Sequence, residues 1–179
     1  MPISDFRSLP STARVWVFGA TAPLAEVARD VLLHAVDDYL ARWRAHGVPL
    51  VCARDWRDER FLAIAVDEAA TGASGCSIDG LFRVLTDIEQ QLGATLTDAG
   101  MVFWRDAIGH VQSDSRAAFR THAQTGAVTM TTPVFDTTIS TVGAWREQFE
   151  QPAQQSWHAR LLAPVRSTSP IPSSPVTPS

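Results

Sequence analysis

The chain has 179 residues, of which 45% are hydrophobic and 19% are charged, a composition typical of a folded globular chain with one sizeable core. Its formal net charge of −4 provides no general attraction to nucleic acid or to an anionic membrane, so we expect neither as a partner. All 15 basic residues are Arg. The absence of Lys excludes the activities that depend on one, such as Schiff-base catalysis and P-loop ATP hydrolysis.

Cysteine usage and hydropathy predict a cytoplasmic location. Cys52 and Cys76 are too few for a disulfide framework, and no C-x-x-C or H-x-x-x-H spacing predicts a metal site. The apolar run at residues 15–25 is interrupted by Gly19 and Pro23, so we do not expect it to be a secretory signal. No stretch is long enough for a transmembrane helix. No motif indicates a cofactor.

The composition divides the chain into three segments. Residues 1–13 contain Pro and Ser without a periodic apolar pattern, and they are predicted to form a flexible arm. Residues 14–162 carry the patterns expected of a single α+β domain. Residues 163–179 consist largely of Pro, Ser and Thr with almost nothing to bury, so we expect a disordered tail.

The first part of the domain alternates strand and helix patterns. Runs of β-branched and aromatic residues predict strands at 14–18, 48–56, 60–66 and 101–104, the last with a short partner at 110–112. Apolar residues that recur every three or four positions predict one helix from about residue 24 to Gly47 and another from about residue 77 to Gly93. The apolar stripe of the first helix includes Leu24, Val27, Val31, Leu32, Ala35, Tyr39, Leu40 and Trp43.

This order of elements, β-α-β-β-α-β, predicts a ferredoxin-like split βαβ core, which is an antiparallel sheet with two helices on one face. Because the run at residues 60–66 is apolar on both faces, we expect it to be a central strand. The C-terminal third is predicted to be an α/β extension, with helices at 115–123 and 140–149 and strands at 128–132 and 134–135. Residues 156–162 form either a last strand or a tail packed on the core.

Two loops of the predicted core precede helices, one at Gly19–Pro23 and one at Asp67–Asp79. In a split βαβ fold the first and third strands are parallel, so both loops would lie at the same edge of the sheet. The free backbone amides of a helix start favour anions, and we therefore expect a small or anionic ligand at that edge. The candidate ligand-binding residues are Ser74, Gly75, Ser77, Asp79, Arg60, Asp67 and Arg160.

Cys76 and His158 are the candidates for catalysis. A helix start lowers the pKa of a thiol, so Cys76 could react as a thiolate that His158 helps to activate. The alternative is that Cys76 is a small buried side chain and that His158 hydrogen-bonds to a backbone carbonyl. Asp67 has two interpretations as well, because it either contributes to the site or caps the turn that follows it.

Several short motifs are spread along the chain: Trp43-x-x-His46-Gly47, Arg60-Phe61, Val66-Asp67-Glu68 and Ser156-Trp157-His158-x-Arg160. Together with the string Ser74-Gly75-Cys76-Ser77-Ile78-Asp79, they resemble an uncharacterised family of small bacterial proteins often labelled ABC transporter ATPases. The resemblance covers about residues 14–162, and it implies a candidate site but no reaction. The label conflicts with the sequence, which lacks the G-x-x-x-x-G-K-[ST] motif of P-loop ATPases.

Two functions of different classes stay open on the sequence alone. In the first, the protein binds a small or anionic ligand at the loop that contains Ser74 and Asp79, with thiol chemistry at Cys76. In the second, it is a non-catalytic interaction or assembly module, and the loop is only a helix cap. The sequence decides neither whether the protein is an enzyme nor its oligomeric state.

Overall fold

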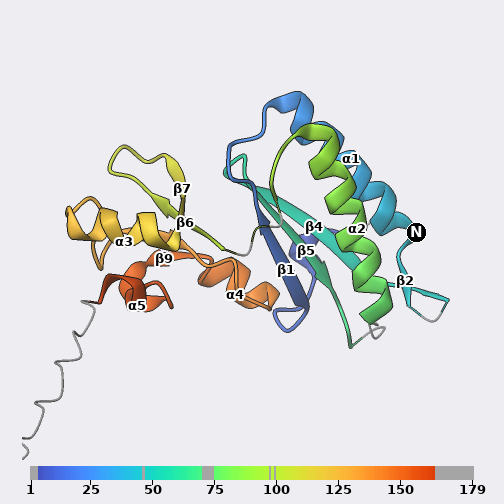
Figure 1. The fold of residues 1–179 in the computed structure, drawn as a ribbon. Helices are drawn as coiled ribbons and strands as arrows, with labels where there is room; N and C mark the ends of the chain where they lie inside the picture. The colour runs from blue at the N-terminus through green and yellow to red at the C-terminus, as the bar shows by residue number, and fades with distance from the viewer. Residues whose placement is uncertain (1–3, 46, 70–74, 97, 99, 164–179) are drawn as a thin grey trace, which may run out of the picture.

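The computed structural model describes residues 4–45, 47–69, 75–96, 98 and 100–163, with only the backbone given at residues 75–77 (Figure 1). These residues form antiparallel sheets and helices, which confirms the predicted α+β class. Within the described chain, no helix is both long enough and apolar enough to cross a bilayer.

The first sheet contains three strands in the order β1 (Arg14–Gly19), β5 (Phe61–Val66) and β4 (Cys52–Arg57). All six residues of β5 are buried, so the predicted central strand is confirmed. Its two faces contribute to different clusters, because Leu62, Ile64 and Val66 pack on one side and Phe61, Ala63 and Ala65 on the other.

Helices α1 (Glu26–Arg42) and α2 (Gly75–Leu92) cover one face of this sheet (Figure 1). Their buried side chains include Leu32 and Val36 of α1 and Leu81 and Leu85 of α2, all fully inaccessible. A short hairpin of β2 (Arg44–Ala45) and β3 (Val48–Pro49) connects α1 to β4. Both predicted helices are therefore present, and they share one face of one sheet as expected.

The strands of the first sheet are antiparallel, with Arg14 opposite Val66 and Gly19 opposite Phe61. The chain that follows β1 therefore lies beside the start of β5, at the opposite end of the sheet from Asp67. The predicted parallel pair, and the shared edge inferred from it, are wrong. Apolar alternation specifies which face of a strand is buried, but it is the same for parallel and antiparallel partners.

The second sheet has the order β7 (Val111–Ser115), β6 (Met101–Arg105), β8 (Pro133–Phe135) and β9 (Glu150–Pro152), and all of its pairs are antiparallel. The ferredoxin-like split βαβ core is not confirmed, because β6 pairs with β7 and β8 instead of with β1. Helices α3 (Arg116–Gln124) and α5 (Ala159–Leu162) pack on this sheet, where they bury Val102, Trp104 and Val134.

The C-terminal elements follow the predictions in part. The helix predicted at 115–123 is α3, and the one predicted at 140–149 is the shorter α4 (Val142–Glu147). Residues 128–132 form a turn instead of a strand, held by the Thr129 amide, which donates to Thr132 Oγ1 at 2.8 Å. A short 3-10 helix, η2 (Ala153–Gln155), precedes α5. Residues 156–162 therefore form no last strand but pack on the core, with Leu161 buried, as the other alternative predicted.

An aromatic cluster joins the two sheets. The ring centroid of Phe61 lies 4.8 Å from that of Phe135 and 5.1 Å from that of Phe103, which places β5 against β8 and β6. Trp145 of α4 packs 4.1 Å from Phe149 in the same cluster. Gly19, at the end of β1, also lies against this cluster. A Cβ atom at this position would be 2.6 Å from the Phe103 ring, which favours glycine here.

The N-terminal segment differs from the flexible arm predicted over residues 1–13. Its described part contains a short 3-10 helix, η1 (Phe6–Ser8), and packs Phe6, Leu9 and Ala13 into the aromatic cluster. Three buried side chains in an irregular segment leave no periodic pattern, so sequence reasoning missed them. The tail predicted at 163–179 lies, beyond residue 163, outside the described residues.

Candidate functional site

A pocket of about 610 Å³ opens between two β-hairpin turns, the one that joins β4 to β5 and the one that joins β6 to β7. We call it the hairpin cleft. It lies where the two sheets meet, so its walls come from segments far apart in the sequence. The lining residues used below are Pro23, Asp58, Arg60, Arg105, His110 and Gln112.

The first turn has a strained backbone. Asp58 and Glu59 have φ values of 51° and 56°, and the amide of Arg60 donates to the carbonyl of Arg57 at 3.1 Å. Two consecutive positive φ angles are typical of a type I′ turn, which usually contains Asn and Gly. Side chains in this conformation carry a conformational cost, and such strain gathers at functional sites.

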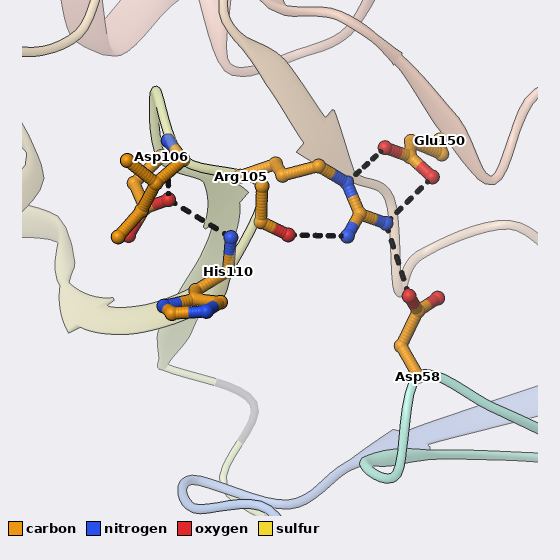
Figure 2. Close-up of polar contacts among 7 residues, drawn as sticks. Asp58, Arg105, Asp106, His110 and Glu150 are labelled. Carbon is orange, nitrogen blue, oxygen red and sulfur yellow. Dashed lines mark hydrogen bonds and ion pairs between the residues drawn. The ribbon is translucent and has the colours of Figure 1, made fainter.

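Arg105 connects the second sheet to this turn. Its guanidinium donates to Glu150 of β9 through Nε at 2.6 Å and to Asp58 through Nη2 at 3.0 Å (Figure 2). The hydrogen bond to Glu150 raises the pKa of Arg105, against a lowering by burial, and Asp58 raises it further. These contacts hold the two walls of the cleft together and leave Asp58 already paired.

Asp106 orders the second turn. Its carboxylate accepts the amide of His110 at 2.8 Å (Figure 2). It also accepts the amide of Ile108 at 3.0 Å and the Gln112 side chain at 2.7 Å. Desolvation raises the pKa of Asp106, but these hydrogen bonds outweigh it and lower the pKa below the ordinary value. The turn is therefore rigid, and the exposed imidazole of His110 stands at the rim of the cleft.

Arg60 is a buried cation of the cleft that forms no ion pair within the described chain. The residue is 9% exposed, and its Nη1 donates to the carbonyls of Thr21 at 2.9 Å and Ala20 at 3.5 Å. Within the described chain, its Nε and Nη2 groups have no hydrogen-bond partner, and no carboxylate lies within ion-pair distance. Burial lowers the pKa of this guanidinium. Arginine is seldom buried without a negative partner, because a desolvated charge is costly.

Among the predicted ligand residues that the structure describes with side chains, Asp67, Asp79 and Arg160 lie apart from Arg60. Asp67 follows β5 at the far end of the sheet and accepts the amide of Ala69 at 3.1 Å, as a turn cap does. Asp79 is exposed on α2, and Arg160 is exposed on α5. Ser74 lies outside the described residues. The backbone of Gly75, Cys76 and Ser77 begins α2, and their side chains are likewise outside the described part.

The structure does not bring His158 to the start of α2. Its ring is fully buried beside α3, 3.9 Å from the Trp157 ring and 6.0 Å from the Phe119 ring. Cys76 begins α2, which packs on the first sheet, whereas α5 packs on the second (Figure 1). The dyad inferred from the sequence is therefore not supported by the fold.

His158 belongs to a network centred on the buried Asp136. Trp157 Nε1 donates to Asp136 at 3.1 Å, and Ser156 Oγ lies 3.3 Å from the same carboxylate and 2.8 Å from His158 Nδ1. His158 Nε2 is buried without a hydrogen-bond partner. These contacts connect the motif Ser156-Trp157-His158 to Asp136, the residue that follows β8 of the second sheet.

We expect His158 to make the fold less stable in mild acid. Burial is the main cause that lowers its pKa to about 4, with Arg116 acting in the same direction and Asp136 against it. The unfolded chain, with a His pKa of about 6.5, then binds the proton first, so stability is complete above that value and falls as the pH drops toward 4. Between pH 7 and pH 5 the loss should be about 2 kcal/mol, measured by urea unfolding.

The matched variant for this experiment is His158→Gln, which removes the titration and keeps a polar side chain beside Ser156. Its unfolding free energy should change less between the two pH values than that of the wild type. An equal change in both proteins would assign the acid sensitivity to other groups.

Cys52 should not react with thiol reagents in the folded protein. It is 3% exposed, its Sγ donates to the Leu40 carbonyl at 3.6 Å, and burial raises its pKa to about 11. Native alkylation of the wild type should therefore report on Cys76, and Cys52→Ser should leave its rate unchanged. A rate that falls by half in Cys52→Ser would show that Cys52 is accessible. The pH dependence of the remaining rate tests the thiolate hypothesis for Cys76.

Sequence reasoning identified Arg60 and missed the rest of the cleft. Asp58, Arg105 and Glu150 come from three separate strands or turns, and nothing in their local sequence indicates that they meet. A usable signal was the pair Asp58-Glu59 in a two-residue hairpin turn, a position that normally carries Asn and Gly.

The chain matches no protein-family model, and comparison with curated proteins and with solved structures also finds no match.

Proposed function

We propose that the protein binds a small carboxylate-bearing ligand in the hairpin cleft. The observation that supports this is Arg60, a guanidinium that is 9% exposed and has no carboxylate partner in the described chain. A carboxylate that binds the free edge of this guanidinium would supply the missing negative charge. Such pairs form two parallel hydrogen bonds and are stronger than neutral ones.

The surroundings of Arg60 favour one monoanionic group. The other cation of the cleft, Arg105, is already bound to Asp58 and Glu150. The carboxylate of Glu59 also lines the cleft. A dianion would therefore bring more negative charge than the one free cation, Arg60, can balance. Pro23 and Val111 provide apolar surface, and the His110 imidazole provides a polar group at the rim. The proposal keeps the anionic ligand expected from the sequence and moves its site from the Ser74–Asp79 loop to Arg60.

The proposal is tested by titrating the full chain with acetate, benzoate and succinate at constant ionic strength, with sodium chloride as the blank. The Arg60 Nε–H signal is followed by NMR. We expect this signal to shift with saturation for at least one carboxylate. A saturable response confined to the start of α2 would instead support the loop, and the absence of any saturable response would contradict the proposal.

The alternative, a non-catalytic interaction or assembly module, has one observation in its favour. One end of β1 is covered, because the Val15 amide donates to Ser140 at 3.0 Å and the Val142 amide donates to Ala13 at 2.9 Å. Beyond Val15 a pocket of about 340 Å³ runs along the outer edge of the strand. In an antiparallel sheet alternate residues face the same edge, so Val17 presents its backbone there and could pair with another strand.

Sedimentation of wild type and Val17→Pro distinguishes this alternative. Proline removes the outward amide and is tolerated on an edge strand. If the chain self-associates through β1, the wild type should form a larger species that Val17→Pro does not form. If both proteins are monomeric at high concentration, self-assembly through the outer edge of β1 is excluded.

A further inference from the structure

A second polar pocket, of about 620 Å³, lies where the N-terminal segment packs against β4. We call it the arm pocket. It is separate from the hairpin cleft and shares none of its lining residues. Four guanidinium groups line it together with two carboxylates, and these residues are Arg7, Arg54, Arg57, Arg146, Asp5 and Asp55.

Both carboxylates are already used by the protein. Asp55 accepts Trp145 Nε1 at 2.8 Å and Arg57 Nε at 3.0 Å, and Asp5 accepts the amide of Arg7 at 2.9 Å. The four guanidinium groups outnumber these two carboxylates in the lining of the pocket.

The other charges do not remove this excess. Arg54 is paired with Asp37 of α1, through two contacts of 2.6 Å. Arg7 and Arg146 form no ion pair within the described chain. A positive charge excess therefore remains in the arm pocket.

Two of the guanidinium groups are held in place by the protein itself. Arg57 lies over the Trp145 ring at 4.3 Å and donates Nη1 to the Trp145 carbonyl at 3.2 Å. Arg146 donates Nη2 to the carbonyls of Phe6, Arg7 and Leu9 at 3.2, 3.1 and 2.9 Å. Each keeps further N–H groups for which the described residues supply no acceptor. Because these side chains are already ordered, a ligand would lose less affinity to their conformational entropy.

We propose that the arm pocket binds a phosphate dianion, either free or as a phosphomonoester. Guanidinium groups recognise phosphate oxygens through paired, charge-assisted hydrogen bonds. Several guanidinium groups around one pocket suit a doubly charged anion, whereas Arg60 in the hairpin cleft suits a single carboxylate. Since Arg146 is bound to three carbonyls of the N-terminal segment, phosphate at this position also stabilises the packing of that segment on β4.

The test is calorimetric titration of the full chain with inorganic phosphate at constant ionic strength, with sodium chloride as the blank. The variant is Arg7→Glu, and the matched control is Arg120→Glu, an exposed Arg on α3. We expect Arg7→Glu to weaken phosphate binding about tenfold or more, since a hydrogen bond between charged groups is lost. Arg120→Glu should bind as the wild type does. Equal weakening by both variants, or no saturable binding by the wild type, overturns the proposal.

Folding does not confound this experiment. The Arg7 side chain is exposed and makes no hydrogen bond in the described chain, so the thermal midpoint of Arg7→Glu without phosphate should equal that of the wild type. Arg60→Met should bind phosphate as the wild type does. Loss of phosphate binding in this variant would show that phosphate binds in the hairpin cleft, which would overturn the proposal. Phosphoserine is titrated in parallel. Tighter binding of phosphoserine than of phosphate identifies a phosphomonoester, and the reverse order identifies the free anion.

Discussion

Replacing Arg60 with Met should abolish carboxylate binding in the hairpin cleft and leave the protein as stable as before or more stable. Met keeps the apolar stem of Arg60 and removes a charge that is buried without a carboxylate partner. Replacing a buried ionic group with an apolar one of similar volume is often neutral or stabilising. Affinity should fall by at least about 100-fold, because the interaction lost is a paired, charge-assisted one. NMR titration and thermal unfolding measure the two effects.

Arg60→Lys separates the charge of Arg60 from its shape. Lys keeps the positive charge but cannot form two parallel hydrogen bonds, so we expect binding that is weaker than in the wild type and stronger than in Arg60→Met. The carbonyl of Thr21 retains Ser113 Oγ as a donor at 2.5 Å, so neither variant leaves it without a partner. Unchanged carboxylate affinity in Arg60→Met would exclude the hairpin cleft as the site. A large loss of stability in that variant would mean that Arg60 is mainly structural.

Replacing Trp145 with Ala should cost the most stability among single substitutions in the aromatic cluster. Trp145 is fully buried. Its ring centroid lies 4.1 Å from that of Phe149 and 6.5 Å from that of Phe6. Truncating a buried Trp to Ala typically costs about 3–5 kcal/mol. The indole also donates to Asp55 at 2.8 Å, so Ala leaves that carboxylate with one partner fewer. Urea unfolding should show a loss of at least about 4 kcal/mol, with a matching decrease in the thermal midpoint.

Two further variants show which part of Trp145 matters. Trp145→Phe keeps an aromatic ring and removes the indole donor, so we expect a loss of about 1–2 kcal/mol. Val27→Ala on α1 is the surface control, because Val27 is 77% exposed and its truncation should change stability by less than about 0.5 kcal/mol. If Trp145→Ala unfolds with the same free energy as Val27→Ala, then the aromatic cluster does not hold the two sheets together.

Local patterns in the sequence were sufficient for most individual elements. β5 was predicted as a central strand because its residues are apolar on both faces, and all six are buried. The two long helices and α3 were found for the same reason, since apolar spacing is a property of a single segment. The helix stripe was less accurate in detail. Val27 was included in it and is 77% exposed, whereas Val36 was left out and is fully buried.

The candidate site was only partly accessible to sequence reasoning. Arg60 was named as a ligand residue at an edge shared by the Gly19–Pro23 turn and the start of α2. The structure places it beside Thr21 of that turn, but the start of α2 lies elsewhere. That error follows from the strand direction, because a parallel β1 and β5 would have put Asp67 next to the end of β1. The Arg105 contacts to Asp58 and Glu150 span 47 and 45 positions in the sequence. No short-range pattern encodes contacts of that range.

What the sequence determined by itself is therefore local: the α+β class, the buried faces of the main elements, and the absence of Lys-dependent chemistry. The tertiary structure alone decided which strands pair, that β6 joins a second sheet, and that an uncompensated Arg60 faces a pocket between two hairpins. The physical reason is that burial depends on the side chains of one segment, whereas pairing direction and charge neutralisation depend on which segments meet.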